Sequence, residues 1–189
     1  MPIPDTPRLT LRVLTPDDAA FYLELVNDPS FLEHIGDKGV RSLAQARAAI
    51  ANGPAAMQLR AGFSLYAMQR KEDGALIGMC GLVQRDTLPG IDIGYALLPA
   101  YRGHGYCYEA ASAVVAHARD DFRLPRLLGI VSPDNAASHA MLQKLGLRYR
   151  ERIVHGELVS DLYVREFGPI SGQKSQPPSE HGDAHSGVA

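Results

Sequence analysis

The chain has little cysteine and no tryptophan: only two of its 189 residues are cysteines. Cys80 lies in a strand-like run and Cys107 in a glycine-rich turn, so the sequence lacks the paired spacing of a disulfide-stabilised fold. A chain of this kind suits a reducing compartment. We therefore expect a cytoplasmic protein without a structural disulfide.

Long hydrophobic runs and an excess of positive charge are also missing. No apolar segment approaches the roughly 18 residues needed to cross a membrane, and Met1 to Pro4 do not resemble a signal peptide. The formal net charge is −2 and the pI is near 6.4, which argues against a sequence-independent nucleic-acid binder. The seven histidines are scattered, so no metal site is expected.

What the chain does contain is enough apolar sequence for one globular core. Apolar residues make up 46% of 189 residues, which fits a single domain. We assign this domain to residues 1–168. The remaining residues, 169–189, are mostly Ser, Gly, Gln, Pro, His and charged residues with little to bury, and we expect them to form a disordered tail.

Hydrophobic periodicity predicts a mixture of strands and helices. Leu9, Leu11 and Val13 alternate with polar residues as in a half-buried strand, and Asp73-Gly74 is a hairpin signal between two such runs. We expect strands at residues 9–13, 63–70, 75–83, 91–98, 127–131, 147–155 and 157–167. We expect helices at residues 15–26, 42–52, 109–122 and 135–145, an irregular stretch between the first two helices, and a turn at Gly156 between the last two strands.

The segment Arg102 to Cys107 joins the predicted strand 91–98 to the amphipathic segment 109–122. Its glycines let the backbone approach a ligand closely, and the helix that follows directs free N–H groups and about half a positive charge toward the same point. A phosphate or pyrophosphate is the expected ligand. The segment lacks the Lys-Ser/Thr of a P-loop and the third glycine of a dinucleotide fingerprint.

At these residues the chain resembles the GNAT family of acetyl-CoA-dependent N-acetyltransferases, whose pyrophosphate loop has the pattern Arg/Gln-x-x-Gly-x-Gly/Ala. Arg102, Gly105 and Cys107 occupy the fixed positions, with Cys107 replacing the usual Gly or Ala. The stretches Thr6 to Arg12 and Ile93 to Ala110 are similar to the RimJ/RimL-like branch of ribosomal-protein N-terminal acetyltransferases.

The resemblance spans about residues 6–167 and implies an α+β fold: a mixed, mostly antiparallel sheet of about seven strands with helices on both faces. It also implies acetyl-CoA as cosubstrate. The cofactor-binding residues would be Leu97, Leu98, Arg102, Gly103, His104, Gly105, Tyr106, Cys107, Asn135 and Ser138. Many members of this family form dimers, so a homodimer is one possibility.

A second segment, Asn135 to Leu147, matches the family pattern Asn-x-x-Ser…Lys-x-Gly-Phe, with Leu147 in place of Phe. Asn135 and Ser138 are three residues apart and share one helical face, where the family places them beside the pantetheine arm. Asn135 could instead serve only as the N-cap of its helix. The tyrosine that many members use as general acid is replaced by Leu142.

Acetyl transfer from a thioester to an amine requires a base, an oxyanion donor and a proton for the departing thiolate. By resemblance, Ser138 is the first candidate for the acid, with Tyr163 or Tyr149 as alternatives. Asp92 is the candidate base, although a solvent-facing strand residue is the simpler interpretation. The oxyanion donor is assigned to a backbone N–H of the Asp92 to Leu98 strand, at Leu97, beside an expected β-bulge.

Glu33 and His34, in the stretch after the first helix, are candidates for the acceptor pocket. His104 lies at a variable loop position, and we expect it to contact solvent or phosphate. Glu109 is expected to favour the helix dipole rather than to catalyse. The acceptor is a primary amine, either a protein N-terminus or a small molecule, and the alternative function is a non-catalytic acyl-CoA-binding sensor or interaction module.

Overall fold

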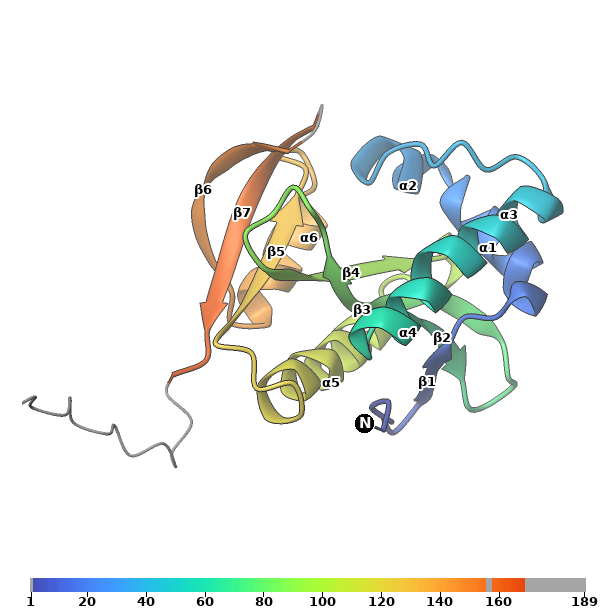
Figure 1. Cartoon of the computed structure of the whole chain (residues 1–189), viewed down its shortest axis with the longest axis horizontal. Coiled ribbons are helices and arrows are strands. Elements are labelled where there is room, and N and C mark those ends of the chain that lie inside the picture. The colour runs from blue at the N-terminus through green and yellow to red at the C-terminus, as the bar shows by residue number, and fades with distance from the viewer. Residues whose placement is uncertain (1, 156–157, 169–189) are drawn as a thin grey trace, which may run out of the picture.

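A computed structural model describes residues 2–155 and 158–168 of the chain (Figure 1). The predicted tail and the turn expected at Gly156 lie outside these residues. Within the described residues, no helix is long and apolar enough to cross a membrane.

The described residues form one seven-stranded sheet with the strand order β1-β2-β3-β4-β5-β7-β6. Neighbouring strands are antiparallel except β4 and β5, which are parallel. The strands are β1 (Leu9–Val13), β2 (Leu65–Arg70), β3 (Leu76–Gln84), β4 (Ile91–Leu97), β5 (Arg126–Val131), β6 (Arg148–His155) and β7 (Leu158–Glu166). The mixed, mostly antiparallel α+β sheet expected from the sequence is confirmed.

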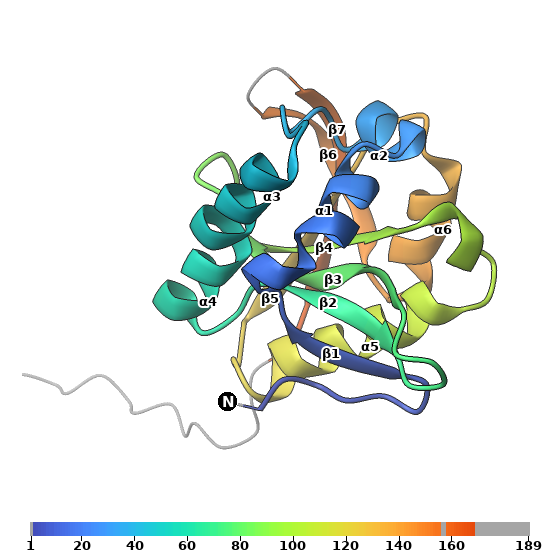
Figure 2. The same cartoon turned by 90° about the vertical axis from the view of Figure 1, so that its right-hand side faces the viewer.

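Helices cover both faces of the sheet. The helical elements before β2 are η1 (Pro16–Asp18), α1 (Ala19–Val26), α2 (Pro29–His34), α3 (Leu43–Ile50), η2 (Ala51–Ala55) and α4 (Ala56–Ala61). Those after β4 are η3 (Pro99–Tyr101), α5 (Tyr106–Asp120) and α6 (Ala136–Lys144). In Figure 2 the strands β1 to β4 run between α1 and α3 above and α5 below.

Three hydrophobic clusters form the core of the described residues, and the two larger ones lie on opposite faces of the sheet. The larger cluster joins the sheet to α5 through an apolar stripe that includes Ala111, Val114 and Ala118, as its helical spacing predicts. The second joins the other face to α1 and α3. Residues of β4 divide between them by strand alternation: Ile93 belongs to the first cluster, and Ala96 packs on the second.

Two predictions for the region between β1 and β2 were wrong. The irregular stretch contains α2, which begins at Asp28-Pro29 with the Asp28 side chain accepting from the amides of Ser30 and Phe31. This is a standard N-cap followed by proline at the first helical position. The helix expected to end before Gly53-Pro54 instead passes through a π-helical turn into α4 and ends at Gly62, whose φ is +77°.

Candidate active site

The glycine-rich loop and the start of α5 form an exposed cradle of backbone amides. Gly103 and Gly105 both have φ of +80°, a conformation that side chains disfavour. The first hydrogen bond at this end of α5 runs from the Glu109 amide to the Gly105 carbonyl at 3.1 Å. The amides of residues 106–108 therefore have no acceptor within the helix, and they can bind an anion.

The N-terminal segment braces this loop from one side. The Glu109 carboxylate accepts hydrogen bonds from Arg8 Nε at 2.6 Å, the Arg8 amide at 2.8 Å and Thr6 Oγ1 at 2.7 Å. Arg8 Nη1 donates to the His104 carbonyl at 3.0 Å, and the guanidinium lies 4.5 Å from the centre of the Tyr106 ring. Glu109 thus holds β1 against the loop, a role that its position near the helix start did not reveal.

Arg102 is turned toward the opposite side of the loop. Its Nε and Nη2 donate to the Leu97 carbonyl at 3.1 and 2.8 Å, and Nη2 also donates to Asp28 Oδ1 at 2.6 Å. Through these two nitrogens the guanidinium therefore bonds to the end of β4 and to the start of α2.

Cys107 occupies the last position of the loop pattern, but its side chain does not contribute a negative charge to the loop. Its side chain packs against the larger core cluster, and burial raises the pKa of its thiol to about 12. The group is therefore neutral at physiological pH, and it adds no negative charge to an anion site.

The backbone of β4 presents alternate amides to its two neighbours. The Leu98 amide donates to Ile77 of the β3 side at 2.9 Å, and the register pairs Leu97 with Gly78 without any shift along this ladder. In an antiparallel ladder alternate residues bond to the same neighbour, so the amides of Ile93, Tyr95 and Leu97 point toward β5. The Leu98 amide is used by the sheet.

Strands β4 and β5 separate beyond Asp92, where the amides of Tyr95 and Leu97 point. In the part of the chain that the structure describes, Asp92 and Leu128 are the one register pair between the two strands. The expected β-bulge in β4 is not recorded in its ladder with β3. The separation instead follows from the divergence of two parallel strands, and it leaves the Leu97 amide facing the opening.

The start of α6 borders the same opening. Asn135 is its N-cap, with Oδ1 accepting from the Ser138 amide at 3.0 Å. The Tyr95 hydroxyl donates to the Ser138 carbonyl at 3.4 Å, which connects α6 to β4 across the gap. Asn135 and Ser138 are thus brought together as their spacing predicts. Leu142, which stands at the usual tyrosine position, is 1% exposed and belongs to the core.

The two alternative tyrosines lie on the terminal hairpin beside α6. The Tyr163 hydroxyl is 2.8 Å from His139 Nδ1, and His139 Nε2 is 3.2 Å from the Pro133 carbonyl. Because that carbonyl can only accept, the neutral ring carries its proton on Nε2 and accepts from Tyr163 at Nδ1. Tyr149 packs edge-on against Tyr163 and is 55% exposed.

Asp92 is buried rather than solvent-facing. It is 1% exposed, and it accepts from Arg85 Nε at 3.0 and 3.2 Å through its two oxygens. Burial raises the pKa of the Asp92 carboxyl above its usual value, while the Arg85 charge acts in the opposite direction. By strand alternation Asp92 lies on the face that Ala96 shares with α1, opposite α5.

Glu33 and His34 end α2, with His34 Nε2 and Glu33 Oε2 3.8 Å apart. In Figure 1, α2 is drawn on the opposite side of β5 from β6 and β7. Phe31 of α2 belongs to the cluster on which Ala96 packs, so α2 lies on the same face of the sheet as Ala96. The structure thus brings the candidate acceptor residues to the face of the sheet that carries Asp92.

The family model described as "Acetyltransferase (GNAT) domain" matches residues 8–148. The chain belongs to the GNAT acetyltransferase family. Among curated relatives, this GNAT chain is 29% identical over 150 residues to the uncharacterised N-acetyltransferase YoaA of Bacillus subtilis (strain 168), which covers 78% of this chain and 83% of YoaA.

Solved GNAT structures share the fold described above. An acetyltransferase from Agrobacterium tumefaciens strain C58 superposes with a TM-score of 0.76 at 25% identity, covering 88% of this chain and 95% of that chain. The aminoglycoside acetyltransferase AAC(6')-Ib, solved with paromomycin and acetyl-CoA, superposes with a TM-score of 0.68 at 20% identity, covering 84% and 93% of the two chains. That second likeness is one of fold.

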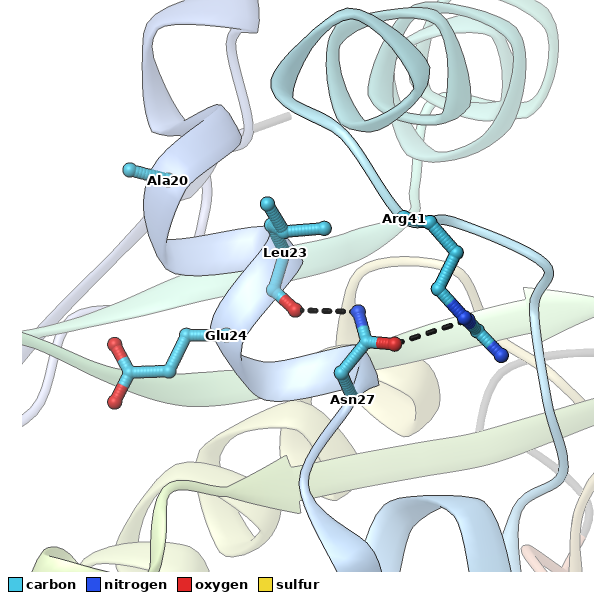
Figure 3. Close-up of a pocket in the computed structure, with 5 residues that line it drawn as sticks. All are labelled: Ala20, Leu23, Glu24, Asn27 and Arg41. Carbon is cyan, nitrogen blue, oxygen red and sulfur yellow. Dashed lines mark hydrogen bonds between the residues drawn. The ribbon is translucent and has the colours of Figure 1, made fainter.

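The GNAT chain also has a cavity of about 350 Å³ on the outer side of α1, lined by Ala20, Leu23, Glu24, Asn27 and Arg41 (Figure 3). Asn27 Nδ2 donates to the carbonyls of Leu23 and Val40, and its Oδ1 accepts from Arg41 Nη1 at 2.9 Å. These bonds attach the segment before α3 to α1. The polar atoms of Asn27 thus already have partners within the chain.

Sequence reasoning did not single out three groups of this GNAT site: Asp28, Tyr95 and Arg8. The Asp-Pro pair at residue 28 is a helix-start signal that could have revealed α2. Tyr95 and Arg8 were quoted only as parts of longer resemblances, and no local pattern shows which distant groups they contact. Among residues 2–155 and 158–168, no cluster of three or more His, Cys, Asp or Glu side chains could hold a metal ion.

Proposed function

We propose that this GNAT protein transfers acetyl from acetyl-CoA to a primary amine by direct attack, as in the RimJ/RimL-like branch. One observation carries the proposal: the amides at the start of α5, which have no acceptor within the helix, follow closely in the chain on the end of β4, where the Leu97 amide is turned away from β3. In this proposal the same segment of chain therefore supplies the amides that bind the anion and the backbone donor at Leu97.

The cradle fits the pyrophosphate of CoA. A Cβ built at Gly103 would meet nothing within 4 Å, and one built at Gly105 would come no closer than 3.5 Å to Arg8 Nη2. The space in front of the loop is therefore open. The glycines are needed because they can adopt a positive φ, rather than because a side chain would lack room. In this proposal residues 103–108 hold the pyrophosphate through their amides, and Asn135 and Ser138 border the pantetheine arm.

When bound, acetyl-CoA supplies the activated acetyl group as a thioester. The Leu97 amide is positioned to donate to an oxygen that gains negative charge in the opening, and a fixed donor of this kind needs no reorganisation during the reaction. The Ser138 hydroxyl, in the first turn of α6, donates a hydrogen bond to the departing sulfur. A thiolate is a good leaving group, so a weak donor is sufficient.

Asp92 is proposed as the base, acting through water on the acceptor face of the sheet. Burial raises the pKa of its carboxyl and the charge of Arg85 opposes that rise, and a carboxylate of this kind is still a weak base. A weak base is adequate for an N-terminal amine, whose ordinary pKa of about 8 leaves an appreciable neutral fraction at physiological pH. Glu33 and His34 would line the acceptor pocket, which takes either a protein N-terminus or a small-molecule amine.

The second candidate function is an acyl-CoA-binding sensor or interaction module without catalysis. It is favoured by the position of Leu142, which is buried where many members carry the acid tyrosine, and by the ion pair that engages Asp92. A cytoplasmic location and a homodimer stay predictions from the sequence.

Release of the CoA thiol from acetyl-CoA tests the proposal directly. The purified chain is assayed against peptides with varied N-termini, amino acids, polyamines and aminoglycosides, with acetyl-CoA alone as the blank. Acetylation of one acceptor class above the blank is the expected result. Tight binding of CoA by calorimetry with no turnover across the panel would favour the sensor instead.

A further inference from the structure

We propose that Arg102 acts as a positioning residue for the acceptor side of the site, by joining the cofactor loop to α2 through Asp28. The inference rests on the proposed function, because it takes α2 as a wall of the acceptor pocket. It assigns Arg102 a task other than supplying charge to the pyrophosphate.

The guanidinium geometry favours this assignment. Arg102 Nη2 bridges two acceptors, the Leu97 carbonyl at 2.8 Å and Asp28 Oδ1 at 2.6 Å, while Nε donates to the same carbonyl at 3.1 Å. The acceptors come from two elements that are distant in sequence, the end of β4 and the start of α2. A planar guanidinium that donates to both acceptors fixes their separation in a way that a flexible lysine does not.

Asp28 makes the bridge specific to α2. Its Oδ1 accepts from the amides of Ser30 and Phe31 at 3.1 and 3.3 Å and from Ser30 Oγ at 2.7 Å. The side chain is 8% exposed, so its charge depends on these donors and on Arg102 rather than on water. Hydrogen bonds from Arg102 and Ser30 hold the pKa of this carboxyl below its usual value despite burial.

The bridge connects the two halves of the proposed reaction. Leu97, whose carbonyl receives the guanidinium, is also the residue whose amide is the proposed oxyanion donor. At its other end α2 carries Glu33 and His34 in its last turn. Arg102 would therefore fix the position of α2 relative to β4. This position matters because transfer depends on the alignment of the acceptor amine with the acetyl donor.

Arg8 provides the contrast. It braces the same loop from the β1 side, through Glu109 and the His104 carbonyl, and within the described residues it makes no hydrogen bond or ion pair with α2. If both arginines simply supported the loop, their removal would have the same consequence. If Arg102 positions α2, the two removals differ: loss of Arg8 weakens cofactor binding, and loss of Arg102 weakens use of the acceptor.

The experiment compares Arg102→Gln, Arg102→Lys, Asp28→Asn and the Arg102→Gln/Asp28→Asn double variant with the full-length wild-type chain. Asparagine is a good N-cap, so Asp28→Asn removes the charge while keeping the helix start. Arg119→Gln is the matched control, because Arg119 is an exposed arginine paired with Asp120 on the far end of α5. Melting temperatures identify any variant that fails to fold.

For the amine accepted in the panel, we expect Arg102→Gln and Asp28→Asn each to raise the acceptor KM about tenfold, the loss expected for one charged hydrogen bond. CoA affinity by calorimetry should stay within about twofold, and Arg102→Lys should be intermediate. The double variant should be no worse than the poorer single variant, because both remove the same contact. A tenfold loss of CoA affinity with an unchanged acceptor KM would overturn the inference.

Amide hydrogen exchange of α2, measured with CoA bound, separates this inference from the proposed function. We expect faster exchange at residues 30–34 in Arg102→Gln than in wild type and in Arg119→Gln. Absence of turnover with every amine would reject the proposed function alone. Unchanged α2 exchange in a folded Arg102→Gln variant would reject the positioning role of Arg102, whether or not the chain is an enzyme.

Discussion

The Glu109 carboxylate lies 2.6 Å from Arg8 Nε although 101 residues separate the two in the chain. Arg8 is half-exposed, whereas Glu109 is largely shielded. The pair closes a ring of contacts in which the first strand, the glycine-rich loop and the first turn of α5 each hold the others. The shape of the loop is therefore set partly by residues outside it.

Removal of this brace should weaken cofactor binding. In Arg8→Gln the His104 carbonyl and Glu109 each lose a charged partner, so the loop gains freedom that binding must then restrict. We expect the Kd for CoA, measured by calorimetry, to rise about three- to tenfold. Arg119→Gln serves again as control and should bind CoA like wild type. Equal affinities for Arg8→Gln and wild type would show that the loop keeps its shape without the brace.

The conformation of Gly105 should be indispensable for the anion cradle. Gly105→Glu places a side chain and a negative charge at φ of +80° in front of the helix N-terminus, and it should abolish detectable CoA binding in calorimetry. Gly62→Ala imposes similar backbone strain at φ of +77°, about 1–2 kcal/mol, at the end of α4. That control should lose stability but keep its affinity for CoA. Unchanged affinity in Gly105→Glu would refute the loop assignment.

Ser138→Ala should slow turnover without loss of cofactor. The variant keeps the Asn135 cap, which uses the Ser138 amide, and removes only the hydroxyl proposed to assist the thiolate. We expect kcat to fall about 10- to 100-fold, within the range for a general acid, with the Kd for CoA unchanged. A variant with wild-type kcat would direct attention to Tyr163, tested by Tyr163→Phe.

Asp92→Asn tests the proposed base through pH dependence. Burial raises the pKa of the Asp92 carboxyl, so the protonated, inactive form persists to higher pH than for an ordinary aspartate. For wild type, kcat/KM should rise with pH as this group loses its proton. Asp92→Asn should be slower and should lack that limb of the profile. An identical pH profile in the two proteins would exclude Asp92 as the base.

Asp18 should make stability depend on acid pH. It accepts from Arg12 Nη2 at 2.7 Å and from the Thr15 amide at 2.8 Å, and the Arg12 hydrogen bond lowers its pKa. Because the pKa in the folded state lies below the unfolded value of about 3.9, the stabilisation is complete above that value and is lost as the pH falls through the folded pKa.

Urea unfolding between pH 7 and pH 3 measures this contribution. Asp18→Asn should cost about 1–3 kcal/mol at pH 7, and its stability should decline less steeply in acid than that of wild type. Asp17→Asn, a change at the exposed neighbouring carboxylate, should leave the wild-type pH dependence in place. Parallel declines for Asp18→Asn and wild type would contradict the assignment.

Local patterns were sufficient for much of the fold and for the loop. The alternation of β1, the Asp73-Gly74 hairpin and the stripe on α5 each express a period that the sequence displays directly. The start of α6 at Asn135 follows in the same way from its capping residue. These features depend on neighbours in the chain, and all of them are present in the structure.

Features that depend on distant partners could not be predicted. The partner of Arg102 is Asp28, and nothing near either residue in sequence indicates the other. Burial of Asp92 follows from packing on its face of the sheet, whereas its polarity suggested solvent. The length of α3 and α4 was underestimated because a π-helical turn accommodates Pro54, which local propensity treats as a stop.

The parting of β4 and β5 gives the sheet two edges inside the molecule. Bare strand edges on a protein surface invite pairing with other chains. In the proposed complex, the ligand would bond to backbone groups of β4 that no neighbouring strand pairs. Occupancy should therefore act as a fold stabiliser: at a CoA concentration 100 times its Kd, the free energy of unfolding should increase by about 2.7 kcal/mol.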